Sequence, residues 1–181
     1  TQEAQVEALF GAVERDLGFV EGLVNSAGVA WKGLFTDMTL ADWHWVVDGD
    51  LTSVFLCCRR ALPAMIREKR GSIVNVSSMW GEVGASCEAA YSAAKAGVIG
   101  LTKALAKEEG PSGIRVNCLS PGVIDTPHER GPDRGGLGSP AGGDPPGATG
   151  TPEETAQAAA FLLEQEFITG QVLGVSGGMV V

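Results

Sequence analysis

Tyr91 and Lys95 are the two residues of this chain whose types and spacing most clearly suggest acid–base chemistry. They stand four positions apart, so on a helix both side chains lie on one face. A free tyrosine has a pKa near ~10 and is a poor acid or base at neutral pH. An ammonium group one turn away favours the phenolate and lowers that pKa, which suits the phenol to general acid–base catalysis.

A pair of serines, Ser77 and Ser78, precedes this motif and follows the apolar run Ile73–Val76. That short β-branched run predicts a buried strand whose end presents the serine hydroxyls. A hydroxyl there can hydrogen-bond to the oxygen of a carbonyl or alcohol substrate. The alternative is that Tyr91 and Lys95 are an ordinary exposed helix pair, because short motifs often match by accident.

The elements that must position these residues alternate between helices and strands. Helical periodicity and stop signals predict four helices. Pro63 should kink or interrupt the second of them, over Thr39–Arg70, and Thr151 should cap the last, over Glu153–Glu164. The predicted helices are Gln2–Leu17, Thr39–Arg70, Ala96–Lys107 (in a run opened by Tyr91) and Glu153–Glu164. The predicted strands are Leu23–Asn25, Ile73–Val76, Gly113–Leu119 and Gln171–Val175.

Five segments occur in one order: Val24–Gly28, Ile73–Ser78, Tyr91–Lys95, Arg115–Asn117 and Pro121–Gly122. Together they resemble the short-chain dehydrogenase/reductase family, and within it the 3-oxoacyl-[acyl-carrier-protein] reductase type. The thirteen positions that separate the second serine from the tyrosine also match that family. The resemblance runs along the whole chain but covers only the later part of the family's domain.

The resemblance implies an NAD(P)-dependent oxidoreductase of fatty acid biosynthesis that reduces a carbonyl, a 3-oxoacyl thioester or similar, to an alcohol. Ser78 would orient the carbonyl, Tyr91 would donate the proton, and Lys95 would lower the tyrosine pKa and bind the nicotinamide ribose. The cofactor is NADP or NAD. The residues implied to bind it are Asn25, Ala27, Gly28, Tyr91, Lys95, Pro121, Gly122, Val123, Ile124 and Thr126.

One position departs from the family pattern. The family's catalytic Asn aligns with Asp50, within Val47–Thr52. The family's Asn is credited mainly with holding a water through its backbone carbonyl, which Asp50 keeps. The Asp50 side chain can pair with Lys95 and change how that lysine serves the tyrosine and the cofactor. We therefore predict Asp50 to be a weakened fourth catalytic residue.

The implied fold is α/β: a Rossmann-like doubly wound parallel sheet that lacks its first strands and its glycine-rich turn. Residues 1–181 would form a single, partial domain. A sheet without its first strands leaves a central strand as an edge, so we expect low stability or a partner that covers this edge. A second function therefore competes: a cofactor-incompetent fragment that acts as a structural or oligomerisation module. Titration with NADPH would separate the two.

Residues 131–150 differ sharply from the rest, because twelve of these twenty are Gly or Pro. Such a composition predicts an irregular loop in the place of the family's substrate lid. Within it, Gly136–Ala141 matches a loose dinucleotide pattern, but it contains a proline and opens no helix, so we reject it. We also reject Gly174–Gly178 as a hydrolase nucleophile elbow, and Asn75–Ser77 as a glycosylation site because it falls in a predicted core strand.

Composition and charge narrow the function classes. A net charge of −9 disfavours nucleic-acid binding. No apolar run is long enough for a membrane span, and the start resembles no signal peptide. Four cysteines without a Cys-x-x-Cys motif predict reduced, mostly buried thiols, and two histidines make a zinc site improbable, so we expect no metal. We expect a cytoplasmic homo-oligomer, a dimer or tetramer, that acts on a small-molecule or acyl-thioester substrate.

Overall fold

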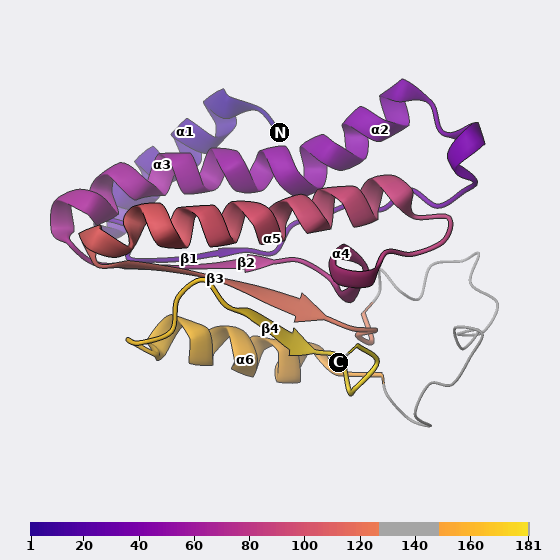
Figure 1. Ribbon diagram of the computed structural model, residues 1–181. Coiled ribbons are helices and arrows are strands. Elements are labelled where there is room, and N and C mark those ends of the chain that lie inside the picture. The colour runs from indigo at the N-terminus through magenta and orange to yellow at the C-terminus, as the bar shows by residue number, and fades with distance from the viewer. Residues whose placement is uncertain (127–148, 181) are drawn as a thin grey trace.

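The computed structural model describes residues 1–126 and 149–180. Over these residues the chain forms a parallel sheet of four strands in the order β1-β2-β3-β4, with helices on both faces (Figure 1). Helices α1, α3 and α5 cover one face, and α6 covers the other. The predicted α/β architecture, doubly wound around a parallel sheet, is therefore confirmed.

The strands β1 (Gly22–Asn25), β2 (Gly71–Val76), β3 (Ile114–Pro121) and β4 (Val172–Val175) lie within two residues of their predicted bounds. Successive residues of the buried strand β2 face opposite sides of the sheet. Ile73 packs into the core under α3 and α5, whereas Val74 packs with Leu162 of α6 on the other side. Because both faces are covered, the sequence of this strand is continuously apolar rather than alternating.

Four longer helices agree with the sequence. The helices are α1 (Glu3–Leu17), α3 (Ser53–Glu68), α5 (Ala89–Glu109) and α6 (Pro152–Glu164). The hydroxyl of Thr151 accepts a hydrogen bond from the Glu154 amide, and the Glu154 carboxylate accepts one from the Thr151 amide. This capping box satisfies amide groups that the first turn of α6 would otherwise leave unpaired.

The stretch predicted as one helix over Thr39–Arg70 is divided, but not at Pro63. Helix α2 (Leu40–Val47) is followed by a π-helical turn, Asp48–Thr52, which leads into α3. Pro63 lies inside α3, which continues from Ser53 to Glu68, so the expected interruption at this proline is wrong. A wider π turn contains Asp50 instead, and such turns often occur at functional sites.

A short helix that the sequence did not predict, α4 (Met79–Val83), follows the end of β2. Ser78 caps its first turn by accepting a hydrogen bond from the Trp80 amide at 3.2 Å. Gly84, at φ +77°, ends the helix in a backbone conformation that favours glycine. Short 3-10 turns at Phe35–Asp37 and Gly110–Ser112 complete the helical segments within residues 1–126 and 149–180.

Strand β1 lies at one edge of the described sheet, paired only with β2. Its exposure agrees with that position, since Val24 is 43% exposed although it lies in a short apolar strand. The predicted edge strand is thus observed, and its consequence for stability stays a prediction. The sequence expectations for residues 131–148, including the rejected motif at Gly136–Ala141, lie outside the described residues.

Candidate active site

Helix α5 carries the two residues from which the sequence argument began. Tyr91 lies in its first turn and Lys95 one turn later, and the Lys95 ammonium is 5.5 Å from the centroid of the tyrosine ring. Tyr91 is partly exposed, whereas Lys95 is only 4% exposed. The predicted arrangement of the two side chains on one helical face is therefore confirmed.

The Lys95 ammonium makes two further contacts that fix its position. It donates a hydrogen bond to the Val76 carbonyl oxygen at 3.1 Å and forms an ion pair with Asp50 Oδ1, also at 3.1 Å. The first contact anchors α5 to the end of β2, and the second anchors it to the π turn.

Asp50 is completely buried, and it holds a third element in place. Its Oδ2 accepts a hydrogen bond from the Val29 amide at 3.3 Å, just after the Ala27-Gly28 turn. A Cβ atom at Gly28 would lie 2.5 Å from Asp50 Oδ1 and 3.3 Å from Lys95 Nζ, so only glycine fits there. The expected pairing of Asp50 with Lys95 is confirmed, and it brings Gly28 into the same cluster.

Ser78 lies at the carboxyl end of β2, two residues after the carbonyl that binds Lys95. The preceding residue, Ser77, donates its hydroxyl to the Lys95 backbone carbonyl at 2.8 Å. A Cβ atom at Gly81 would lie 2.8 Å from both the Ser77 hydroxyl and the Lys95 carbonyl carbon. Helix α4 thus packs directly on α5, which places the predicted catalytic serine on an element that contacts the lysine.

Asn25 serves the sheet through its side chain. Its amide donates to Asn75 Oδ1 at 2.8 Å, and the Asn75 amide donates in turn to the Thr102 hydroxyl at 3.0 Å. The network joins β1, β2 and α5 in the interior, where Asn75 is fully buried. The Asn25 side chain is therefore occupied by a hydrogen bond within the protein, so we expect any cofactor contact of Asn25 to come from its backbone. The burial of Asn75 also agrees with its rejection as a glycosylation site.

The segment predicted to hold the nicotinamide ring continues from β3. Pro121 is the last residue of that strand, and the Gly122 amide donates to the Val175 carbonyl at the end of β4 at 3.0 Å. Beyond it, Ile124 bridges to Gly150, whose amide donates to the Val123 carbonyl at 2.9 Å. The segment therefore lies at the carboxyl edge of the sheet, where ligands bind in open α/β folds. Thr126 follows it as a partly exposed residue.

Comparison with known proteins agrees with this arrangement. A family model described as "Enoyl-(Acyl carrier protein) reductase" matches residues 1–180. The 3-oxoacyl-[acyl-carrier-protein] reductase FabG of Chlamydia muridarum is 43% identical over 91% of this chain and 67% of its own length. The corresponding protein of Thermotoga maritima is 40% identical over 100% of this chain and 74% of its own length.

The chain belongs to the short-chain dehydrogenase/reductase family. Among solved structures, a putative gluconate dehydrogenase from Agrobacterium tumefaciens superposes with a TM-score of 0.87 at 31% sequence identity. That alignment covers 99% of this chain and 74% of the other. This member of the family is therefore an oxidoreductase by descent, with the α/β fold that the sequence predicted.

The cysteines of this reductase-family chain lie outside its acid–base cluster. All four are free thiols, and burial raises the pKa of Cys58 to about 12 and that of Cys118 to about 11. Cys57 and Cys87 are only partly buried, so the expectation of mostly buried thiols holds for two of the four. No group of three or more potential metal ligands occurs in the described parts of the chain. Among the described helices, none is long and apolar enough to cross a bilayer.

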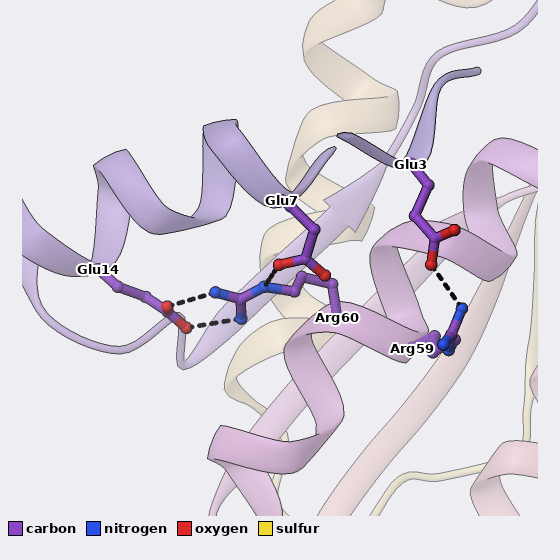
Figure 2. Close-up of polar contacts among 5 residues, drawn as sticks. All are labelled: Glu3, Glu7, Glu14, Arg59 and Arg60. Atoms are coloured by element: carbon purple, nitrogen blue, oxygen red, sulfur yellow. Dashed lines mark hydrogen bonds and ion pairs between the residues drawn. The ribbon is translucent and has the colours of Figure 1, made fainter. Parts of the chain in front are cut away.

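A groove of about 440 Å³ lies elsewhere, between α1 and α3. Its walls carry Glu3, Glu7 and Glu14 from α1 and arginines from α3, and Figure 2 shows how Arg59 and Arg60 reach across to the glutamates. None of the predicted site residues lines this groove. We therefore interpret it as the contact between two helices and not as part of the active site.

Sequence reasoning missed several groups of the family site. The Val76 carbonyl oxygen that binds Lys95 has no sequence signal, because any residue supplies a carbonyl. The Ser120 hydroxyl donates a hydrogen bond to the Glu82 carboxylate, which joins the end of β3 to α4. The spacing of Ser78 and Glu82, one helical turn, was a usable signal once α4 was identified as a helix.

Proposed function

We propose that this enzyme reduces a carbonyl, a 3-oxoacyl thioester or a related compound, to an alcohol with NADPH or NADH as the reductant. The observation that carries the proposal is the Lys95 ammonium, buried and 5.5 Å from the Tyr91 ring centroid at the carboxyl end of β2. The names of the relatives support the substrate class, since several are 3-oxoacyl-[acyl-carrier-protein] reductases.

In this proposal the Tyr91 phenol donates its proton to the carbonyl oxygen, and the hydroxyl of Ser78 holds that oxygen by a hydrogen bond. The positive charge of Lys95 favours the phenolate that is left behind. A nicotinamide cofactor, when bound, supplies the hydride to the carbonyl carbon. In this proposal the Lys95 ammonium also donates a hydrogen bond to a ribose hydroxyl of the cofactor.

Asp50 is proposed as a modulating member of the site. Its carboxylate lies 3.1 Å from the Lys95 ammonium and balances the charge of that group. The Asp50→Asn variant should therefore release part of the lysine charge toward the tyrosine and increase turnover. An unchanged turnover number in this variant would remove the Asp50 side chain from the catalytic role.

The test follows the oxidation of NADPH and of NADH at 340 nm with a 3-oxoacyl thioester as substrate. Wild-type chain should turn over, and Tyr91→Phe should lower kcat by a factor on the order of 10²–10⁴ while its unfolding curve stays unchanged. The better of the two reductants identifies the cofactor. A Tyr91→Phe variant as active as wild type would refute the proposed mechanism.

A structural or oligomerisation role is the second candidate, favoured by the exposed edge of β1 and by the exposed ring of Phe55 on α3, which is 45% exposed. It predicts a stable dimer or tetramer that fails to bind NADPH or NADH in a fluorescence titration. Light scattering after size-exclusion chromatography measures the assembly directly. Saturable cofactor binding would reject this candidate and support the reductase.

A further inference from the structure

Glu82 carries a carboxylate that the proposed reaction does not use. It lies on α4, one helical turn beyond Ser78, which caps that helix. Ser78 and Glu82 therefore both belong to the short segment that follows the carboxyl end of β2. Glu82 is exposed, and its charge therefore acts on molecules that approach this end of the sheet.

A hydrogen bond fixes the position of this carboxylate. The donor is the hydroxyl of Ser120, a residue with no exposed surface that precedes Pro121 at the end of β3. The neighbouring residue Leu119 is paired in register with Val76 of β2, and its carbonyl accepts the Ser77 amide at 2.8 Å. Glu82 is thus held between the strand end that leads to Ser78 and the one that leads to the predicted nicotinamide segment.

Within residues 1–126 and 149–180, the Glu82 carboxylate accepts the Ser120 hydrogen bond and forms no ion pair. Lys95, the cation of the cluster, is already paired with Asp50. Both charges act on the buried Cys118 thiol of β3: burial raises its pKa to about 11, the Lys95 charge acts to lower that pKa, and the Glu82 charge acts to raise it. Because Asp50 balances the Lys95 charge, the exposed Glu82 carboxylate adds a negative charge at this end of the sheet.

We propose that Glu82 is a specificity-determining residue that excludes anionic carbonyl compounds from the site. The enzyme would then accept the ester or thioester of a 3-oxo acid in preference to the free acid. This inference rests on the proposed reductase function, because it names the substrate form that the same site accepts. Like charges repel over several ångströms at a partly exposed site, and salt weakens that repulsion.

The experiment compares two substrates that share one reacting carbonyl, acetoacetate and its neutral ethyl ester. Glu82→Gln keeps an oxygen that can accept the Ser120 hydrogen bond but removes the charge. Its kcat/KM for acetoacetate should rise roughly fivefold, mainly through KM, and its kcat/KM for the ester should change less than about twofold. The matched control is Glu164→Gln, at the exposed end of α6 on the other face of the sheet, which should change neither value.

An equal effect of Glu82→Gln on the two substrates would overturn the inference and leave the proposed function intact. Turnover of neither substrate by the wild-type chain would count against the proposed function, and a second measurement then decides the role of Glu82. Quenching of tryptophan fluorescence by iodide should increase in Glu82→Gln relative to Glu164→Gln, because Trp80 is partly exposed two residues from Glu82. Quenching by neutral acrylamide should not change, and an unchanged iodide quenching would reject anion exclusion.

Discussion

In the described parts of the chain, two sets of ion pairs join helical segments, and they differ in how much water surrounds them. The Lys95–Asp50 pair links α5 to the π turn, with its side chains 5% and 0% exposed. The pairs between α1 and α3 lie at the surface: Arg60 and Glu14 are 21% and 28% exposed, and Arg59 and Glu3 are 61% and 60% exposed (Figure 2).

The comparison separates positioning from stability. Removing two charges from water costs about as much free energy as their attraction returns, so a buried ion pair adds little net stability to the fold. Its value then lies in the position that it gives to the charged groups. Here it sets the position of the amine beside Tyr91 and holds the Ala27–Val29 turn. The surface pairs cost less to form and contribute less, and they attach α1 to α3.

The largest expected effect comes from breaking the buried pair. Lys95→Met should lower the free energy of unfolding by about 3–5 kcal/mol, because Asp50 stays buried without its cation. The double variant Asp50→Asn/Lys95→Met should recover most of this loss, since it leaves no buried charge. Urea unfolding at pH 7 measures both. A Lys95→Met chain as stable as wild type would show that Asp50 does not depend on this lysine.

The second-largest loss of stability should come from the surface ion pair that is less exposed, Arg60 with Glu14. Arg60 donates to both oxygens of Glu14 and to Glu7, so Arg60→Met should cost about 1 kcal/mol with no effect on catalysis. The Arg60 hydrogen bond lowers the pKa of Glu14, so its stabilising contribution is complete above the ordinary carboxyl pKa and is lost as pH falls through the lowered one. The stability gap between wild type and Arg60→Met should therefore narrow as the pH is lowered from 7 to 3. A gap independent of pH would contradict this account.

A buried carboxylate without a cation should have the opposite pH dependence to Glu14: its contribution to stability should fall as the pH rises. Glu109, at the end of α5, is 8% exposed and has no ion-pair partner among the described residues. Burial raises its pKa, so the folded state binds the proton more tightly and loses stability as pH rises through the interval between the ordinary and the raised value. Glu109→Gln should stabilise the protein by about 0.5–1 kcal/mol at pH 7, and by nothing at pH 3. The exposed neighbour Glu108→Gln should have a smaller effect, and an equal one would argue against burial as the cause.

The smallest effect is expected for the most exposed pair. Glu3→Gln removes the negative charge that lies 2.8 Å from Arg59, and it should change stability by less than about 0.5 kcal/mol in dilute buffer. In 0.5 M salt the difference should fall below detection, because salt screens exposed charges. Thermal melts of this variant beside Arg60→Met would sharpen the comparison. A loss as large as that of Arg60→Met would mean that exposure does not rank these pairs.

Local sequence determined the elements and one half of the site. The apolar runs set the strands, and Thr151 with Pro152 set the start of α6. The four-residue spacing of Tyr91 and Lys95 placed both side chains on one helical face, since the geometry of a helix depends only on near neighbours. Short-range patterns therefore predicted most of the fold without any knowledge of packing.

Tertiary structure decided the contacts between residues that are far apart in the sequence. Asp50 meets Lys95 across forty-five positions of the chain, and Asn25 turns its amide to Asn75 across fifty. The π turn at Asp48–Thr52 is a second example, because an extra residue in a helix is tolerated only where packing holds it. The buried face of a helix or strand follows from the spacing of nearby residues, so a local pattern predicts it. The partner of a buried polar group depends on which distant elements the fold brings together, and no local pattern contains that information.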